Sequence, residues 1–162
     1  MSVAFTKEDS AQTASETMLP DRPISPEPNL VTQAGLAELQ TQLEDARLAY
    51  AAASAIEDID ERRRQSAIPL RDLRYFTERL RSAQLVQNPD ALDVVAFGTI
   101  VTFSGDDGRE RRYRIVGEDE ADPKAGSMSY ASPVARLLVG RGVGDVVTLG
   151  NKDLEIIAIS QN

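Results

Sequence analysis

The sequence predicts an α+β protein: an N-terminal antiparallel helical hairpin of the coiled-coil type, then a small antiparallel sheet domain with one short helix. In the first half, apolar residues recur at alternating spacings of three and four, which is the pattern of coiled-coil core positions. After residue 94, apolar and polar residues alternate between Gly-containing turns, as they do in half-buried strands. The change of period marks the border between the two parts.

The first helix of the hairpin is predicted to begin after Thr32, a residue type that caps helix N-termini well. The chain from 34 to 55 contains no proline, so an unbroken helix of roughly 20 residues, about 30 Å long, is expected. Its predicted core positions are Leu36, Leu39, Leu43, Ala46, Tyr50 and Ala53.

The second helix repeats the core pattern at Leu73, Phe76, Leu80 and Ala83. If the two sets face each other antiparallel, the chain folds back near residue 59 or 60. Pro69 falls on the second set and is expected to kink the helix or to end its first segment. Four arginines share one face, either as a solvated face paired with acids or as a contact for a phosphate backbone: Arg64, Arg71, Arg74 and Arg81.

Four acids crowd the fold-back point: Glu57, Asp58, Asp60 and Glu61. Asp58 and Glu61 have the spacing of a capping box that begins the second helix. Converging carboxylates at the end of a projecting arm would also suit delivery of a metal site to another macromolecule. A cap uses one carboxylate and leaves the others free, so the two interpretations are compatible. Mutual repulsion should raise one pKa or turn one side chain away, and Arg62–Arg64 can offset part of the charge.

The sheet domain is predicted from a run of strands and turns. Strand patterns at 97–103 and 112–116 flank a turn at Asp106-Asp107-Gly108, and strands at 145–149 and 154–160 flank a turn at Gly150-Asn151. Between the two pairs, Ser132 and Pro133 have the residue types of an N-cap and a first helical position, and Gly140 ends a short helix.

Composition sets the limits on chemistry. The 162 residues include no Cys, His or Trp, which excludes disulfides, thiolate or imidazole catalysis and ordinary zinc sites. A net charge of −8 without a strongly basic segment argues against DNA binding by phosphate neutralisation. No membrane span or signal-peptide pattern is present, so a cytoplasmic protein is expected. The expected organisation is a disordered tail (1–31), the hairpin (32–87), a linker (88–94) and the sheet domain (95–162).

Three stretches of the sheet domain, at 115–122, 129–140 and 143–147, together resemble the C-terminal domain of the GreA/GreB transcription elongation factors. The Thr32-x-x-Gly35-x-x-x-Leu39 start of the hairpin is also similar to the family's. The resemblance implies an FKBP-like fold for the sheet domain. It further implies a non-enzymatic factor that binds bacterial RNA polymerase at the rim of its secondary channel and modulates elongation.

The family's tip motif, Asp-x-x-Glu, matches Asp58 and Glu61, with Asp60 and Glu57 as secondary candidates. By resemblance these acids assist cleavage of backtracked RNA in trans by sharing a Mg²⁺ with the polymerase, so no cofactor is expected to bind the free protein stably. The family's rim-facing loop corresponds to Ala131, Ser132, Pro133 and Arg136. A monomer is expected, with indirect contact to nascent RNA.

The tip departs from the family pattern at Arg62–Arg64, where Asn, Ala and Glu are usual. The hairpin also looks about one heptad shorter per helix, which removes roughly 10 Å of reach. A Rnk-like or channel-blocking regulator that does not stimulate cleavage is therefore an open alternative. Two further alternatives are a peptidyl-prolyl isomerase, from the FKBP-like fold, and a self-associating interaction protein.

Overall fold

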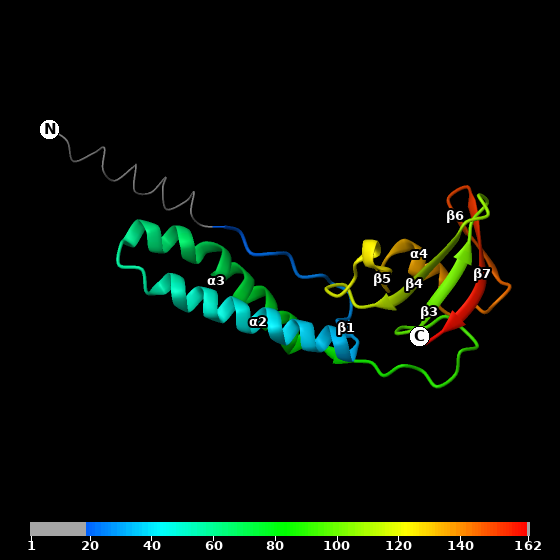
Figure 1. Ribbon diagram of the computed structural model, residues 1–162, viewed down its shortest axis with the longest axis horizontal. Coiled ribbons are helices and arrows are strands. Elements are labelled where there is room, and N and C mark those ends of the chain that lie inside the picture. The colour runs from blue at the N-terminus through cyan, green and yellow to red at the C-terminus, as the bar shows by residue number, and fades with distance from the viewer. Residues whose placement is uncertain (1–18, 162) are drawn as a thin grey trace. The chain divides into compact units, whose positions relative to one another are not determined.

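The computed structural model describes residues 19–161, which form two compact units (Figure 1). The hairpin unit comprises residues 19–25 and 39–81, and the C-terminal unit comprises 26–38 together with 82–161. Residues 1–18 of the predicted tail lie outside the described residues. In the described part of the chain, no helix is long and apolar enough to cross a membrane.

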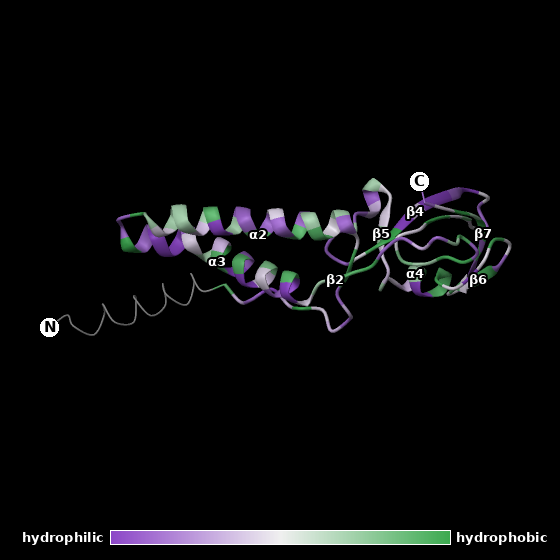
Figure 2. Ribbon diagram, turned by 90° about the horizontal axis from the view of Figure 1, so that it is seen from below, coloured by the Kyte–Doolittle hydropathy of each residue, from purple (hydrophilic) through white to green (hydrophobic). Residues whose placement is uncertain are grey.

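The predicted helical hairpin is confirmed. Helices α2 (Gln33–Ser54) and α3 (Ile59–Ser82) lie side by side and antiparallel in Figures 1 and 2. On α2 the buried apolar residues are four of the predicted core positions, Leu39, Leu43, Ala46 and Ala53, and apolar and polar turns alternate along the helix in Figure 2. The connecting loop spans 55–58, slightly earlier than predicted, because the Asp58 side chain caps α3 and makes Ile59 its first residue.

Pro69 lies inside one continuous helix of 24 residues, so of the two alternatives expected for it, the one in which it ends the first segment of the helix is wrong. The proline ring removes one backbone N–H, and the flanking turns keep the helix intact. A second unexpected feature is Arg79, which is only 2% exposed and has at least one interaction partner. The predicted core positions Leu73, Phe76 and Leu80 are only partly buried around it.

The arginine face of α3 pairs with acids, which favours the first of the two interpretations given for it. Each of the four side chains lies in an ion pair at a nitrogen–oxygen distance between 2.5 and 3.4 Å. The pairs are Arg64–Glu61, Arg71–Asp72, Arg74–Asp21 and Arg81–Glu78.

The described part of the predicted tail is packed, which composition did not indicate. In the hairpin unit, the Arg22 guanidinium lies 3.8 Å from the centroid of the Tyr75 ring and 3.3 Å from a carboxylate oxygen of Asp72. A cation over an aromatic face is attracted by the ring quadrupole, and a charged partner beside it adds to the attraction. Low hydrophobicity predicts disorder only where such specific contacts are lacking.

The C-terminal unit contains a five-stranded sheet in the order β5-β4-β3-β7-β6. All neighbouring strands are antiparallel except β4 and β5. The predicted α+β class is confirmed. Within this sheet, β5 is the one strand that the sequence did not predict. The strands are β3 (Ile100–Ser104), β4 (Glu110–Val116), β5 (Ser127–Ser129), β6 (Val146–Leu149) and β7 (Lys152–Ser160).

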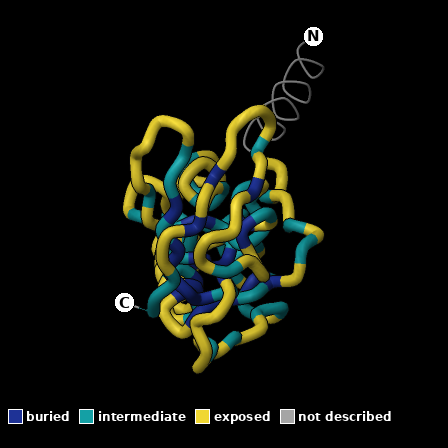
Figure 3. The backbone as a smooth tube through the Cα atoms, turned by 90° about the vertical axis from the view of Figure 1, so that its right-hand side faces the viewer, coloured by how far each residue is buried: buried dark blue, intermediate teal, exposed yellow. Residues whose placement is uncertain are grey.

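Helix α4 (Pro133–Leu138) begins and ends where the sequence predicted. The Ser132 hydroxyl accepts a hydrogen bond from the Ala135 N–H at 3.3 Å, and Gly140 follows the helix with a φ of +86°. Together with the sheet, α4 encloses the core, whose buried stretches gather in the interior in Figure 3. The fully buried members include Val101, Ile115, Ala135, Leu138 and Ile156.

A two-stranded parallel pairing, not predicted from sequence, joins the two ends of the hairpin. In it β1 (Leu30–Val31) pairs with β2 (Gln84–Leu85). The Leu30 carbonyl oxygen lies so close to Gly117 that any Cβ at that position would clash with it. Residues 26–32, directly before α2, therefore belong structurally to the C-terminal unit.

Replacing Leu138 by Ala is expected to destabilise the C-terminal unit by about 2–5 kcal/mol, because it removes a fully buried side chain and leaves a cavity. Urea denaturation followed through the NMR intensities of amides in β3 and β7 measures the effect. The matched control is Val139→Ala on the adjacent, 42% exposed side chain, which should change stability by less than about 0.5 kcal/mol. Equal effects of the two substitutions would contradict the core assignment.

Candidate functional site

The predicted tip acids lie at the start of α3. The Asp58 Oδ1 accepts a hydrogen bond from the Glu61 backbone N–H at 2.8 Å, so Asp58 is the N-cap. The Glu61 carboxylate points forward along the helix, with Oε2 at 2.6 Å from Nη2 of Arg64 and Oε1 at 2.8 Å from Nε2 of Gln65. The Asp58 side-chain bond of the predicted capping box is thus present. The Glu61 side chain bonds to Arg64 and Gln65.

The electrostatics of the tip follow from these contacts. The hydrogen bonds from Arg64 and then Gln65, together with the charge of Arg64, lower the pKa of Glu61 below its ordinary value. Asp60 and Glu61 also lie in the first turn of α3, where the helix dipole favours negative charge. The predicted offset of the acidic charge by neighbouring arginines is therefore realised at Glu61, while the side chains of Glu57 and Asp60 are exposed.

As a metal site the tip is incomplete by itself. Within residues 19–161 no three acidic side chains gather in a way that could hold a metal ion. Asp58 and Glu61 offer the oxygen ligands that Mg²⁺ prefers, but the ion needs about six ligands in near-octahedral geometry. The donor type fits Mg²⁺, and the remaining ligands would have to come from outside this chain.

The four residues of the predicted rim-facing loop come together at the N-terminus of α4, and we call residues 131–136 the docking turn. Ser132 caps the helix and Pro133 is its first residue. The Arg136 Nε donates to the Ala131 carbonyl at 2.8 Å, which folds the side chain back over the turn. Ala131, Ser132, Pro133 and Arg136 therefore all contribute to one partly exposed surface.

Beside the docking turn lies a groove of about 560 Å³. Among its lining residues, Nη2 of Arg111 lies 2.8 Å from Oδ2 of Asp107. The hydrogen bonds from the Arg111 side chain and from the Arg109 backbone N–H lower the pKa of Asp107 to about 2. Sequence reasoning missed this groove, because its residues come from separate strands that only the sheet brings together. The groove is lined by Ser132 and by six apolar or aromatic side chains: Phe103, Tyr113, Met128, Val134, Leu149 and Leu154.

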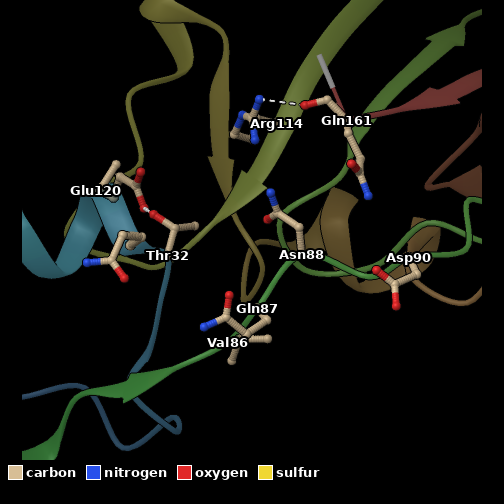
Figure 4. Close-up of a pocket in the computed structure, with 10 residues that line it drawn as sticks. Thr32, Val86, Gln87, Asn88, Asp90, Arg114, Glu120 and Gln161 are labelled. Carbon is tan, nitrogen blue, oxygen red and sulfur yellow. Dashed lines mark hydrogen bonds between the residues drawn. The ribbon is translucent and has the colours of Figure 1, made fainter.

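A second, polar pocket of the C-terminal unit, about 500 Å³, lies where α2 begins (Figure 4). Here the Thr32 hydroxyl donates to Oε2 of Glu120 at 2.6 Å and accepts from the Gly35 N–H at 2.9 Å. Glu120 thereby fixes the N-cap of α2 to the acidic loop after β4. On the opposite wall, Arg114 donates to the Gln161 carbonyl at 2.8 Å. The importance of Glu120 was not visible in the sequence, since Thr32 is 88 positions away.

Comparison with known proteins agrees with this arrangement. The family described as "Transcription elongation factor, GreA/GreB, C-term" matches residues 88–161, which places the C-terminal unit in a class of transcription elongation factors. GreA of Alkalilimnicola ehrlichii is 35% identical over 133 residues, covering 72% of this chain and 84% of that protein. Such an alignment is too long to be confined to the C-terminal domain and includes part of the hairpin. The chain belongs to the GreA/GreB family.

Other relatives match over shorter spans. GreA of Thioalkalivibrio sulfidiphilus is 42% identical over 54% of this chain and 60% of that protein. GreB of Neisseria meningitidis is 39% identical over 55% of this chain and 58% of that protein. The alignments with these two relatives thus span about three fifths of their length. Among solved structures, GreA factor homolog 1 of Thermus thermophilus is 23% identical, with coverage of 82% of this chain and 99% of that chain and a TM-score of 0.38.

Substitution of Asp58 by Ala is expected to destabilise the start of α3 by about 1 kcal/mol, because the Glu61 N–H loses its acceptor. Amide hydrogen exchange in residues 59–63 reports the fraying. The control is Asp58→Ser, which removes the carboxylate and keeps a capping hydroxyl, and it should restore most of the protection. If Ser frays the helix as much as Ala does, the charge of Asp58 and not its cap is what stabilises the turn.

The Glu61–Arg64 pair predicts a pH dependence confined to acid. Because the pKa of Glu61 is lowered in the folded protein, the pair stabilises the tip fully above the ordinary carboxylate pKa, and this stabilisation is lost as pH falls through the lowered value. Titration of the Glu61 side-chain ¹³C resonance should give a midpoint below the ordinary range, and Arg64→Gln should raise it. A wild-type midpoint at or above the ordinary value would refute the pairing in solution.

Proposed function

We propose that this protein binds bacterial RNA polymerase at its secondary channel and modulates transcription elongation in the cytoplasm, as a monomer without enzymatic activity of its own. The observation that carries the proposal is the 35% identity to a GreA that spans 84% of that protein, in a chain with an acid-tipped hairpin. A pull-down with the cognate polymerase tests it directly, and absence of a complex at micromolar concentration would refute it.

The docking turn and the adjacent groove support polymerase binding through the C-terminal unit. The groove offers apolar walls next to Ser132, and the turn offers a cationic side chain at Arg136. A partner surface with an apolar anchor residue beside an acid would match both. Buried apolar anchors in pockets commonly dominate the affinity of such interfaces, while the charges at the rim contribute orientation and association rate.

The tip acids support a catalytic contribution in trans. In the proposed mechanism, Asp58 and Glu61 would supply carboxylate oxygens to a Mg²⁺ that the polymerase and the RNA also ligate, with Asp60 and Glu57 contributing negative charge nearby. When bound, that ion would supply an activated water for cleavage of backtracked RNA. To ligate the ion, the Glu61 carboxylate would first have to break its ion pair with Arg64, whose Nη2 lies 2.6 Å away in the free protein. The ion pair therefore opposes metal ligation by Glu61.

A channel-blocking factor without cleavage stimulation is the second candidate. Arg62, Arg63 and Arg64 follow the acids directly, and the Glu61 carboxylate of the tip is ion-paired with Arg64. Such a tip would occupy the channel by its volume, whatever its chemistry. The direction of the effect on elongation separates the two candidates.

A double variant, Asp58→Ser with Glu61→Gln, is designed to separate tip chemistry from folding, because both replacements keep hydrogen-bonding groups and remove both carboxylates. Polymerase affinity should change by less than about threefold, while cleavage of backtracked RNA falls to the level without the factor. Loss of binding would mean that the acids anchor the complex. Full retention of the regulatory effect would favour occlusion of the channel.

Peptidyl-prolyl isomerase activity is the third candidate, and the groove is the observation that favours testing it. Phe103 and Tyr113, whose rings stack at a centroid distance of 6.1 Å, line it. Both rings also pack into the core of the sheet, which argues for a structural use. A protease-coupled assay with a proline peptide should show no turnover above background, and clear turnover would establish the enzyme.

A further inference from the structure

The docking turn is already occupied by residues of its own chain. Residues 26–28, which we call the proline segment, run past it in the C-terminal unit. The Glu27 Oε1 lies 2.7 Å from Nη2 of Arg136, and the Tyr130 hydroxyl donates a hydrogen bond to the Pro28 carbonyl. A carboxylate thus contacts the Arg136 guanidinium, and a backbone carbonyl contacts the Tyr130 hydroxyl.

The surface under the proline segment is prearranged by contacts that do not involve that segment. The Arg136 Nε is fixed to the Ala131 carbonyl at 2.8 Å, which leaves Nη2 directed at an incoming carboxylate. The Tyr130 ring packs edge-on against Phe97, at a centroid distance of 5.8 Å and an angle of 72°. Prearranged groups pay little ordering entropy on binding, so such a surface suits recognition.

The contacts described for the proline segment include an exposed ion pair that contributes little free energy. The side chains of Arg136 and Glu27 are 57% and 37% exposed, and an exposed ion pair of this kind changes an equilibrium constant by only about one- to fivefold. Pro26 and Pro28 have no N–H to donate to a neighbouring strand. The Pro28 carbonyl also accepts from the Leu30 N–H at 3.0 Å, so it keeps a partner when Tyr130 is taken away.

The chain becomes firmly anchored one residue later. Asn29 is 5% exposed, its Nδ2 donates to the Ser82 hydroxyl at 3.2 Å, and its carbonyl accepts from the Gln84 N–H at 2.8 Å. The parallel pairing of Leu30 and Val31 with β2 follows directly. The border between a segment that can be displaced and one that is fixed therefore lies between Pro28 and Asn29.

We propose that Tyr130 and Arg136 form a binding site for an extended, acidic segment of a partner protein, and that the proline segment occupies this site in cis and leaves it when the partner binds. The occupant defines the ligand class: a carboxylate for the arginine, and a backbone carbonyl for the tyrosine hydroxyl. That the partner is RNA polymerase rests on the proposed function, whereas the occupancy in cis does not.

Tethering sets the size of the effect. A segment joined to its site through a few residues competes at an effective concentration of the order of millimolar or above, so even weak contacts mask the site until a partner outcompetes them. Because the Glu27–Arg136 ion pair is exposed, its contribution to masking should reduce the affinity for a partner by a few-fold. The proline segment would thus tune affinity for the partner without abolishing binding.

The experiment compares full-length variants for their affinity to the polymerase. Glu27→Gln should tighten binding by about two- to fivefold, because the mask loses its charge. Arg136→Gln should weaken binding, and adding Glu27→Gln to it should have no further effect. The matched control is Asp21→Asn, which removes the same charge from a comparably exposed pair with Arg74 on the hairpin unit and should leave affinity unchanged.

Three results would overturn the proposal: no effect of Glu27→Gln, weaker binding by that variant, or tighter binding even without Arg136. If even the wild-type chain fails to bind polymerase, the proposed function fails, and a peptide titration decides the site alone. A peptide of residues 24–30, added to the ¹⁵N-labelled Glu27→Gln protein, should shift the resonances of Tyr130 and Arg136. The same peptide with Gln at position 27 should shift them less, and equal or absent shifts would refute the site.

Discussion

The parallel pairing of β1 with β2 is the constraint that holds the start of α2 beside the end of α3. It brings together residues that lie 54 positions apart in sequence, at the entrance of α2 and the exit of α3. Directly after β1, Thr32 caps α2 and donates to Glu120, so the pairing, the helix start and the acidic loop form one hydrogen-bonded assembly. Gly117 permits it, because the Leu30 carbonyl occupies the space of a side chain there.

The two candidate site regions differ in how their side chains are held. At the docking turn, the Arg136 and Ser132 side chains bond to backbone groups of the turn itself, and Ala135 and Leu138 of α4 lie in the buried core. At the tip, the acids are exposed, Asp58 accepts from the Glu61 backbone N–H, and Glu61 is bound to the neighbouring side chains of Arg64 and Gln65.

Several of the arginines in the described part of the chain are paired with acids. The arginines of α3, the tip acid Glu61 and the docking-turn Arg136 all lie in ion pairs that are at least partly exposed. Exposed pairs contribute little to stability, and they are exchanged at low cost when a better-placed partner appears. The net charge of −8 therefore coexists with cationic groups that are available to a partner but covered in the free chain.

The sequence alone determined the elements that local chemistry dictates. The periodicity of α2, its Thr32 cap, the Asp58 cap, the Ser132-Pro133 start of α4 and most strands were readable because each depends on residues within a few positions. Tertiary structure decided the rest: the burial of Arg79, the continuity of α3 through Pro69, the pairing of β1 with β2, the Glu120 contact and the packed segment from Arg22 to Pro28. The β1–β2 pairing, the Glu120 contact and the packing of the segment from Arg22 to Pro28 join residues tens of positions apart through a few contacts, and such contacts leave no period or composition in the sequence to detect.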